Sequence, residues 1–407
     1  MRRGTNLPAV GGFNQAVILD AIRRSPDGVS RVELQERTGL AYQTVANGAK
    51  RLLEDGYIRE GAKKGTGPGK PGLLLHVADR GRYAVGIHID PAVTTCVLID
   101  LSGSIIAREQ TRTPEPIRPE EVIGALAASV DRLVAEAGVD RSLVLGIGIA
   151  SPGPIDVDRG VVVDPPLLEG WKEVPLRDAL AAATGQPVVL EKDVNAAVVG
   201  ELWLRRETRE DFVFFYLGTG IGMGLALRGE LVRGASGNAG EGGTLFVPVS
   251  GSVEPGRASM LGWLATPDYI LRQAADDGII PAAPAQQDLS AIEAAFDALL
   301  DRERGGERPV RDLFARAADV IATALLSVVN LLDVADIVVG GPYWDRLAPW
   351  MEDRIAASLQ DSPYRKTRHP VRLRRTVLGE EVAAVGAATL ILDNALAPKA
   401  DSLLIAE

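Results

Sequence analysis

The sequence predicts an α/β protein in which a small, mostly helical head precedes a larger body of alternating strands and helices. Three observations predict this arrangement. Apolar residues recur at helical spacing through residues 1–80, short apolar runs alternate with amphipathic stretches from Tyr83 onward, and the net charge changes sign between the two parts. With 407 residues, the chain is long enough for two or three domains.

Charge separates the two parts clearly. Residues 1–80 carry 13 Lys and Arg against 8 Asp and Glu, a net charge of +5, whereas the remainder carries −15. A basic head on an acidic body indicates that the head meets a polyanion. The single cysteine, Cys96, excludes an intramolecular disulfide, and no run of about 18 apolar residues predicts a membrane span. We therefore expect a cytoplasmic protein without membrane contact.

Two helices are expected in the first half of the head. Apolar residues at 17–22 follow Asn14, a possible N-cap. Ser30 and Glu33 have the spacing of a capping box for a second, short helix. Gly39 ends that helix, because only glycine bends there without steric cost.

A third helix is expected from about Ala41 to Asp55, with an apolar inner face. Its outer face carries the side chains that we predict to contact DNA, namely Gln43, Thr44, Asn47, Lys50 and Arg51. A polar helix after a glycine turn has the geometry that enters a major groove. Glutamine and asparagine can bond adenine bidentately, whereas lysine and arginine suit phosphates or guanine. Gly48, which costs about 1 kcal/mol relative to alanine inside a helix, and Ala41 at the capping position weaken this pattern.

A hairpin is expected after the third helix. Residues 57–59 and 73–77 can pair, and the tip between them carries Lys63, Lys64 and Lys70, which can follow a DNA backbone or enter a minor groove. We therefore predict that residues 1–80 form a winged helix-turn-helix that binds a double-stranded DNA operator. A helical protein-interaction module with a solvated loop is the alternative.

The body has the pattern of an α/β fold. Strands are expected at residues 84–89, 95–99, 143–149, 188–190, 213–217 and 337–339, and helices at 119–137 and 313–332. Seven motifs follow one another in this framework: Gly86–Ala92 with Asp100–Gly103, Pro152–Pro154 with Gly170-Trp171 and Val174–Leu176, Glu191–Ala197, Gly218–Gly224, Gly237–Glu241, Val339–Gly341 and Val385–Ala388.

These motifs, in this order and with the winged head, resemble the ROK family of repressors, open reading frames and sugar kinases over roughly residues 12–395. The resemblance implies a two-lobed actin-like, ribonuclease-H-like ATPase fold, the fold of the sugar kinases. Residues 81–205 plus 380–395 would form the first lobe, and residues 206–379 the second, with effector-binding and dimerisation roles. It also implies a homodimer or a dimer of dimers.

The first phosphate loop departs from the kinase pattern. Family kinases have Asp-x-Gly-Gly-Thr, and the corresponding positions here are His88, Asp90, Pro91 and Ala92. Pro91 has no N–H to offer a phosphate. Asp90 places a negative charge there, and a like-charge pair at about 4 Å costs roughly 4 kcal/mol at an effective dielectric near 20. We therefore predict no enzyme activity, no catalytic residue and no cofactor.

The sugar side is altered as well. By the resemblance, Lys192 stands for a sugar-binding Asn, Asp193 for the general base, Glu241 for the signature Glu and Thr244 for a His. These four are the predicted ligand-binding residues. The segment corresponding to the family's zinc cluster, about Ser252 to Leu261, contains no cysteine, so no metal is expected.

Several roles stay open on the sequence alone. Asp193 can bind a ligand hydroxyl, act as a residual base or pair with Lys192. Trp171 can stack on a sugar or pack in a hinge. His88 is expected to be a core histidine, and Gly218–Gly224 a tight strand–turn–strand. The leading interpretation is a repressor of carbohydrate metabolism that senses a sugar or sugar derivative. The alternatives are a constitutive DNA-binding dimer with a ligand-free body, or an active sugar kinase.

Overall fold

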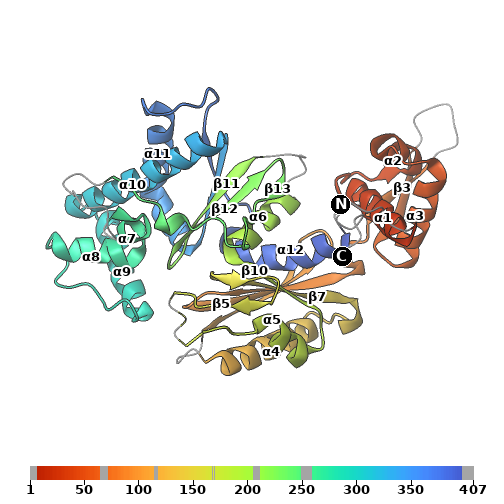
Figure 1. The fold of residues 1–407 in the computed structure, drawn as a ribbon, viewed down its shortest axis with the longest axis horizontal. Coiled ribbons are helices and arrows are strands. Elements are labelled where there is room, and N and C mark those ends of the chain that lie inside the picture. Colours follow the sequence, from red (N-terminus) through yellow and green to blue (C-terminus); the bar gives the residue numbers. More distant parts are fainter. Residues whose placement is uncertain are drawn as a thin grey trace.

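The computed structural model describes residues 7–64, 72–113, 118–166, 168, 170–204, 211–248 and 259–396, and it has the predicted head and two-lobed α/β body (Figure 1). In the head, three helices pack with a three-stranded sheet of order β1-β3-β2. Their bounds are α1 (Leu7–Arg23), β1 (Val29–Ser30), α2 (Arg31–Thr38), α3 (Tyr42–Glu54), β2 (Ile58–Lys64) and β3 (Gly72–Val77). β2 and β3 form the predicted antiparallel hairpin, with Ile58 opposite Val77. The winged helix-turn-helix is therefore confirmed.

Most of the local signals in the head act as expected. The Ser30 and Glu33 capping box is formed, and Gly39 ends α2 with φ 70°. Gly48 is a glycine because α1 crosses α3 there: a Cβ at this position would lie 2.5 Å from the Ile18 side chain. The predicted N-cap at Asn14 is wrong, because α1 begins at Leu7 and continues through that position. Interior glycines at 11 and 12 cost only about 1 kcal/mol each and do not stop the helix.

The first lobe is a five-stranded sheet of order β10-β7-β4-β5-β6. Its strands are β4 (Tyr83–Ile89), β5 (Val93–Asp100), β6 (Ile105–Arg112), β7 (Val144–Ser151) and β10 (Val188–Lys192); β8 (Ile155–Asp156) and β9 (Val161–Val162) form a separate pair. Helices α4 (Pro119–Glu136) and α5 (Leu176–Thr184) cover one face of this sheet and close a hydrophobic core. β4, nearly continuous in apolar residues, is completely buried at the centre.

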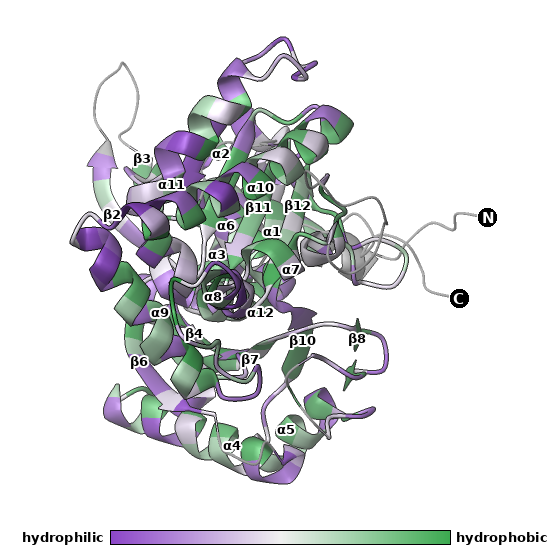
Figure 2. Ribbon diagram, turned by 90° about the vertical axis from the view of Figure 1, so that its left-hand side faces the viewer, coloured by the Kyte–Doolittle hydropathy of each residue, from purple (hydrophilic) through white to green (hydrophobic). Residues whose placement is uncertain are grey.

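The second lobe has a sheet of order β13-β12-β11-β14-β15. Its strands are β11 (Phe212–Leu217), β12 (Ile221–Leu227), β13 (Glu230–Leu231), β14 (Asp336–Gly340) and β15 (Arg372–Arg375), and its helices are α7 (Gly262–Ala265), α8 (Pro267–Asp276), α9 (Leu289–Arg304), α10 (Arg308–Leu332) and α11 (Pro342–Asp361). Colouring by hydropathy shows β11 and β12 as largely hydrophobic and α11 as more hydrophilic (Figure 2). By length and composition α10 could span a membrane, but its apolar face packs in the core of this lobe.

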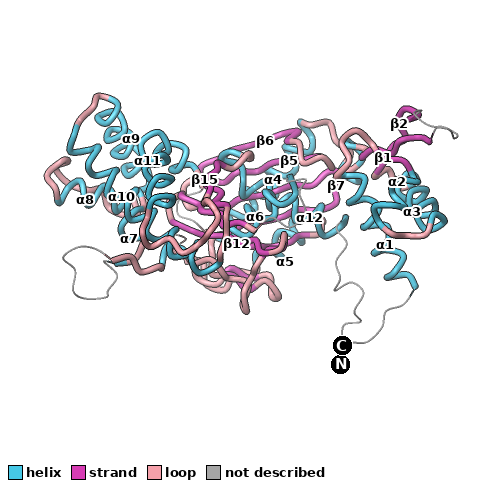
Figure 3. The backbone as a smooth tube through the Cα atoms, turned by 90° about the horizontal axis from the view of Figure 1, so that it is seen from above, coloured by secondary structure: helices cyan, strands magenta, loops and turns pink. Residues whose placement is uncertain are grey.

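Two helices, α6 (Asp193–Leu204) and α12 (Val382–Leu396), lie between the two sheets. α12 packs on β4 and β7, α6 packs on β12, and the two helices pack on each other. Short 3-10 turns among the described residues include η1 (Asp79–Gly81), η2 (Arg141–Leu143), η3 (Gly242–Thr244) and η5 (Gly379–Glu381). Seen from above, the head and helices α8 and α9 lie at opposite ends of the molecule (Figure 3).

The crossing of α6 and α12 gives a stability prediction. A Cβ at Gly386 would lie 1.9 Å from the Ala196 carbonyl oxygen, so Gly386→Ala must push the helices apart. We expect it to lower the free energy of unfolding by about 1–3 kcal/mol. Gly124→Ala, on the exposed face of α4 with no atom within 4 Å, should instead raise it by about 0.4–1 kcal/mol. Chemical denaturation of both variants measures their free energies of unfolding. Equal changes in the two variants would contradict the close crossing of α6 and α12.

Candidate functional site

The outer face of α3 is exposed as the sequence predicts. Gln43 and Asn47 lie one turn apart on it, and Gln43 Nε2 donates to Asn47 Oδ1 at 3.1 Å. Lys50 is 3.7 Å from Glu54 in an exposed pair, an arrangement worth at most about 1 kcal/mol and easily exchanged for a phosphate. Arg51 is exposed and Thr44 is half-buried. The face is therefore polar and open to a partner.

Other parts of the head extend or limit this surface. Tyr42, which the sequence pattern did not single out, is 50% exposed at the start of α3. Lys63 is exposed near the end of β2. Lys64 ends that strand, but its side chain lies outside the described residues, and so does Lys70. The contribution of the hairpin lysines to DNA binding thus stays a prediction.

Lys192 and Glu241 join the two lobes. Lys192 ends β10 in the first lobe and is 3% exposed, and its Nζ donates to Glu241 Oε1 at 2.5 Å. The same ammonium also donates to the carbonyl oxygens of Asn238 at 3.4 Å and Ala239 at 3.3 Å. An ammonium has three N–H donors, so all of them have acceptors here. The partner of Lys192 is therefore Glu241, in the other lobe. The alternative in which Lys192 forms an ion pair with Asp193 is wrong.

Asp193 is the first residue of α6. Its Oδ1 accepts from the Val194 N–H at 2.7 Å, which satisfies one of the free donors of the helix N-terminus. Burial raises the pKa of the Asp193 carboxyl, whereas the nearby His88 and Lys192 side chains act in the opposite direction. Asp193 therefore lies close to Lys192 and His88 without a hydrogen bond between them among the described residues.

The loop around Glu241 is fixed by backbone contacts. Asn238 accepts from the Ile155 N–H at 2.8 Å and donates to the Ile155 carbonyl at 2.7 Å, which clips this loop to the first lobe. The Thr244 hydroxyl donates to the Glu241 carbonyl at 2.7 Å. Behind them, buried Glu191 accepts from Asn195 at 3.0 Å and from Arg233 at 2.8 Å. The four predicted ligand residues thus form one neighbourhood, in which Thr244 orders the turn.

The first phosphate loop is closed by its own aspartate. Asp90 Oδ1 accepts from the Ala92 N–H at 2.9 Å, and Oδ2 accepts from the Thr219 hydroxyl at 3.4 Å. Thr219 lies in the tight turn between β11 and β12, where Gly218 N–H donates to the Gly220 carbonyl at 2.9 Å. The expected strand–turn–strand is confirmed, and the Asp90 carboxylate accepts from donors on both sides of the boundary between the lobes, the Ala92 N–H and the Thr219 hydroxyl.

Two of the open roles are decided by burial. Trp171 is completely buried in the hydrophobic core of the first lobe, so it packs there and cannot stack on a ligand. His88 is buried on β4, as expected of a core histidine, but its ring also borders a cavity between the lobes. Its ring has no hydrogen-bond partner among the described residues.

The region expected to lack zinc is only partly described. Residues 252–258 lie outside the described residues, and in the parts that are described no group of three or more His, Cys, Asp or Glu could hold a metal ion. Beside it, Leu261 is buried, and Trp263 stacks on Tyr269 with ring centroids 5.4 Å apart. Packing of this kind orders the start of α7.

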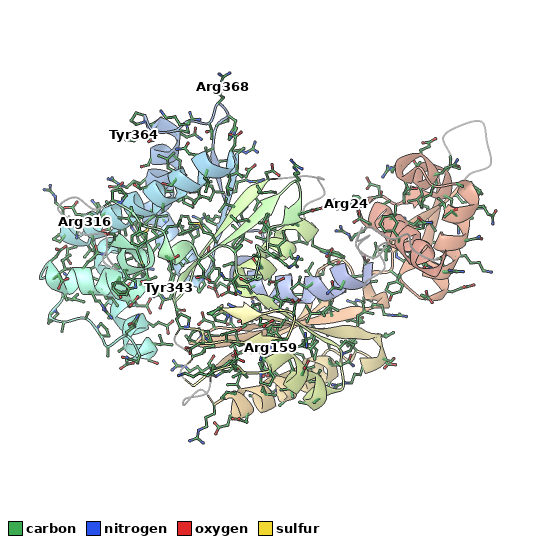
Figure 4. The ribbon with its side chains drawn as sticks, in the orientation of Figure 1. Arg24, Arg159, Arg316, Tyr343, Tyr364 and Arg368 are labelled. Atoms are coloured by element: carbon green, nitrogen blue, oxygen red, sulfur yellow. The ribbon has the colours of Figure 1, made fainter. Side chains whose placement is uncertain are left out.

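A contact between the head and the body was not predicted. Arg23, in the last turn of α1, places its guanidinium 4.0 Å above the Trp203 ring and donates to the Trp203 carbonyl at 2.7 Å. Asp20 holds the same guanidinium at 2.7 Å. A cavity of about 300 Å³ borders this contact, lined in part by Arg24 and His76. Arg24 is labelled at the edge of the head that faces the body (Figure 4).

Comparisons with known proteins agree with this architecture. The ROK family profile matches residues 84–394. The xylose repressor of Bacillus subtilis is 28% identical over 240 residues, which span 58% of this chain and 61% of the repressor. A crystal structure of a ROK family transcriptional regulator, described as a homolog of the E. coli MLC protein, covers 95% of this chain and 98% of its own at a TM-score of 0.76 and 20% identity. The ROK hexokinase of Thermus thermophilus covers 75% of this chain and 97% of its own, with a TM-score of 0.57 and 28% identity.

Proposed function

The chain belongs to the ROK family, and we propose that it is a transcriptional regulator that binds operator DNA through its head and senses a sugar derivative in its body without phosphorylating it. The observation that carries this proposal is the exposed pair Gln43 and Asn47 on α3 of a winged helix-turn-helix. Phosphoryl transfer does not require such a helix face, whereas its amide side chains can hydrogen-bond the edges of bases in a major groove. The relatives named as repressors or regulators support the same function.

The absence of kinase chemistry is the second part of the proposal. Asp90 holds the Ala92 N–H and the Thr219 hydroxyl, which are groups that would otherwise face a nucleotide phosphate. Pro91 offers no N–H in the same loop. ROK relatives include kinases such as the Thermus thermophilus hexokinase, and the altered loop is the reason why a ligand bound in this body would not be phosphorylated. Purified protein should therefore show no sugar-dependent turnover of ATP.

The effector proposed for the site is an anionic sugar derivative. Lys192 is the buried cation of this neighbourhood, and Glu241, 55% exposed, is its only carboxylate partner among the described residues. A sugar acid or sugar phosphate can replace the Glu241 carboxylate on the ammonium while its hydroxyls bond Asp193. This exchange would break the ion pair between Lys192 and Glu241, which joins the two lobes. A ligand shifts such an equilibrium only by its differential affinity for the two states.

The assembly proposed for this regulator is a homodimer or a dimer of dimers in the cytoplasm, with the lobes divided at residues 205 and 380. A dimer presents two heads to half-sites one helical turn, about 34–36 Å, apart. If loss of the Lys192–Glu241 ion pair changes the distance between the two heads, the dimer would therefore release the operator.

Operator affinity with and without candidate effectors tests this function. For the wild type, a panel of neutral sugars and their acid or phosphate derivatives should contain an anionic compound that changes affinity by roughly 5- to 150-fold. Lys192→Met should lose that preference, because the buried cation is gone. Thr184→Ser, at the end of α5, is a matched control that should respond like the wild type.

Two outcomes would contradict the proposal. If the operator is bound tightly and no sugar or sugar derivative changes its affinity, the protein is a constitutive DNA-binding protein. If sugar-dependent ATP turnover is found, the protein is a kinase with an accessory head.

A further inference from the structure

A cavity of about 290 Å³ lies between the lobes and is lined by residues of both. His88, Asp90 and Gln110 contribute from the first lobe, and Tyr216, Glu293 and Tyr343 from the second. Tyr343 lies on the side of the second lobe that faces the first, whereas Tyr364 and Arg368 lie at its outer tip (Figure 4). The cavity includes none of Lys192, Asp193, Glu241 or Thr244 in its lining, so it is separate from that neighbourhood, and it lies beside the loop of Asp90, Ala92 and Thr219 described above.

Two buried polar side chains open on this cavity without a partner. His88 is 5% exposed and Tyr216 is 7% exposed, and their rings meet edge to face with centroids 6.2 Å apart. Neither ring has a hydrogen-bond partner among the described residues. Oδ2 of Asp268, also in the lining, is buried without a partner there. Because buried polar groups are nearly always hydrogen-bonded, these three point to a ligand that supplies the missing bonds.

The charge of the lining selects the class of that ligand. Four carboxylates line the cavity, Asp90, Asp268, Glu293 and Glu380, against the single guanidinium of Arg346, which is paired with Asp297. Burial raises the pKa of Tyr216 well above its usual value, and the charges of Asp90, Asp193 and Glu380 add to this effect. The interior is therefore electronegative and disfavours an anion.

We propose that this cavity binds a small organic amine carrying one or more ammonium groups. Ammonium groups bond carboxylates and the faces of tyrosine rings, both of which line the cavity. A bare metal ion fits less well, because no three acidic or His side chains among the described residues converge on one point. The volume is close to the lower limit of about 300 Å³ for small-molecule pockets, so the ligand is smaller than a nucleotide. This site goes beyond the proposed regulator function.

The test uses the full-length protein and simple probes. Calorimetry and thermal unfolding are followed with 1,4-diaminobutane and spermidine, with the neutral isostere 1,4-butanediol, and with ATP, all at matched ionic strength. The two amines should bind and raise the melting temperature, whereas the diol and ATP should not. Glu293→Gln combined with Asp268→Asn should weaken amine binding by roughly ten- to hundred-fold, because hydrogen bonds to charged groups are lost.

Glu136→Gln, which removes an exposed charge of α4 outside the cavity, is the control and should bind the amines like the wild type. The proposal is overturned if neither amine binds, if the diol binds as well as the diamine, or if the double variant retains full affinity. Binding of ATP in preference to the amines would likewise overturn it and would assign the cavity to a nucleotide.

Discussion

Replacing Gln43 and Asn47 together by alanine is expected to abolish sequence-specific operator binding while the head stays folded. The two side chains are exposed and hydrogen-bond each other, so no core contact is lost. Alanine is the best helix former, so α3 should not be weakened. Each bidentate base contact is worth about 1–3 kcal/mol, which for two contacts corresponds to roughly 30-fold to 10⁴-fold in affinity.

Fluorescence anisotropy with the operator and with a scrambled duplex, at several salt concentrations, measures this effect. The double variant should bind both duplexes with the weak affinity of non-specific DNA. Gln287→Ala, an equally exposed glutamine in the second lobe, should bind like the wild type. Lys50→Ala should weaken both duplexes alike and reduce the slope of log affinity against log salt by about 1. Unchanged operator affinity in the double variant would show that α3 is not the recognition helix.

Local signals in the head were sufficient to predict its fold. The capping box at Ser30, the left-handed glycine at 39 and the amphipathic pattern of α3 each act over one or two turns, so they can be recognised without tertiary information. Gly48 could only be explained by the structure, because its reason is the Ile18 side chain of another helix. The start of α1 was missed because Asn14 resembles an N-cap in sequence, although the helix begins at Leu7 and continues through it.

The candidate site was predicted less completely than the fold. Motif order placed Lys192, Asp193, Glu241 and Thr244 in one neighbourhood, but it could not pair Lys192 with Glu241, which lies 49 residues away in the other lobe. The cavity beside His88 was also beyond the sequence, because a buried histidine on an apolar strand has the same pattern whether or not its ring faces a void. Partners between lobes depend on tertiary geometry that no local spacing encodes.

The contact between the head and the body suggests how a ligand signal reaches the DNA. α6 begins at Asp193, beside Lys192, and ends one residue after Trp203, on which Arg23 of the head rests. A helix of 12 residues is about 18 Å long, so α6 links the neighbourhood of Lys192 to the contact with the head. α12 runs beside α6 between the sheets and toward the head (Figure 1). Arg23 donates to the Trp203 carbonyl and lies over its ring, so this polar connection between the head and the body would be displaced by a shift of α6.

We therefore expect Arg23→Ala to uncouple the head from the body. Operator affinity without effector should stay within a few-fold of the wild type, and the effector should bind the body with unchanged affinity. The factor by which effector changes operator affinity, normally about 5- to 150-fold for an allosteric pair, should fall close to one. Operator titrations with and without the effector, together with calorimetry of effector binding, separate these three quantities.

Arg31→Ala is the matched control, because it removes an arginine whose ion pair with Glu60 lies entirely within the head. It should leave the coupling factor as in the wild type, whereas Trp203→Leu, which removes the ring from the body side, should reproduce the loss. If Arg23→Ala lowers operator affinity itself, the contact only stabilises the head. If Arg23→Ala and Trp203→Leu both respond to the effector as fully as the control does, the signal does not pass through the end of α6. Coupling that survives the loss of either side of a contact must be carried elsewhere.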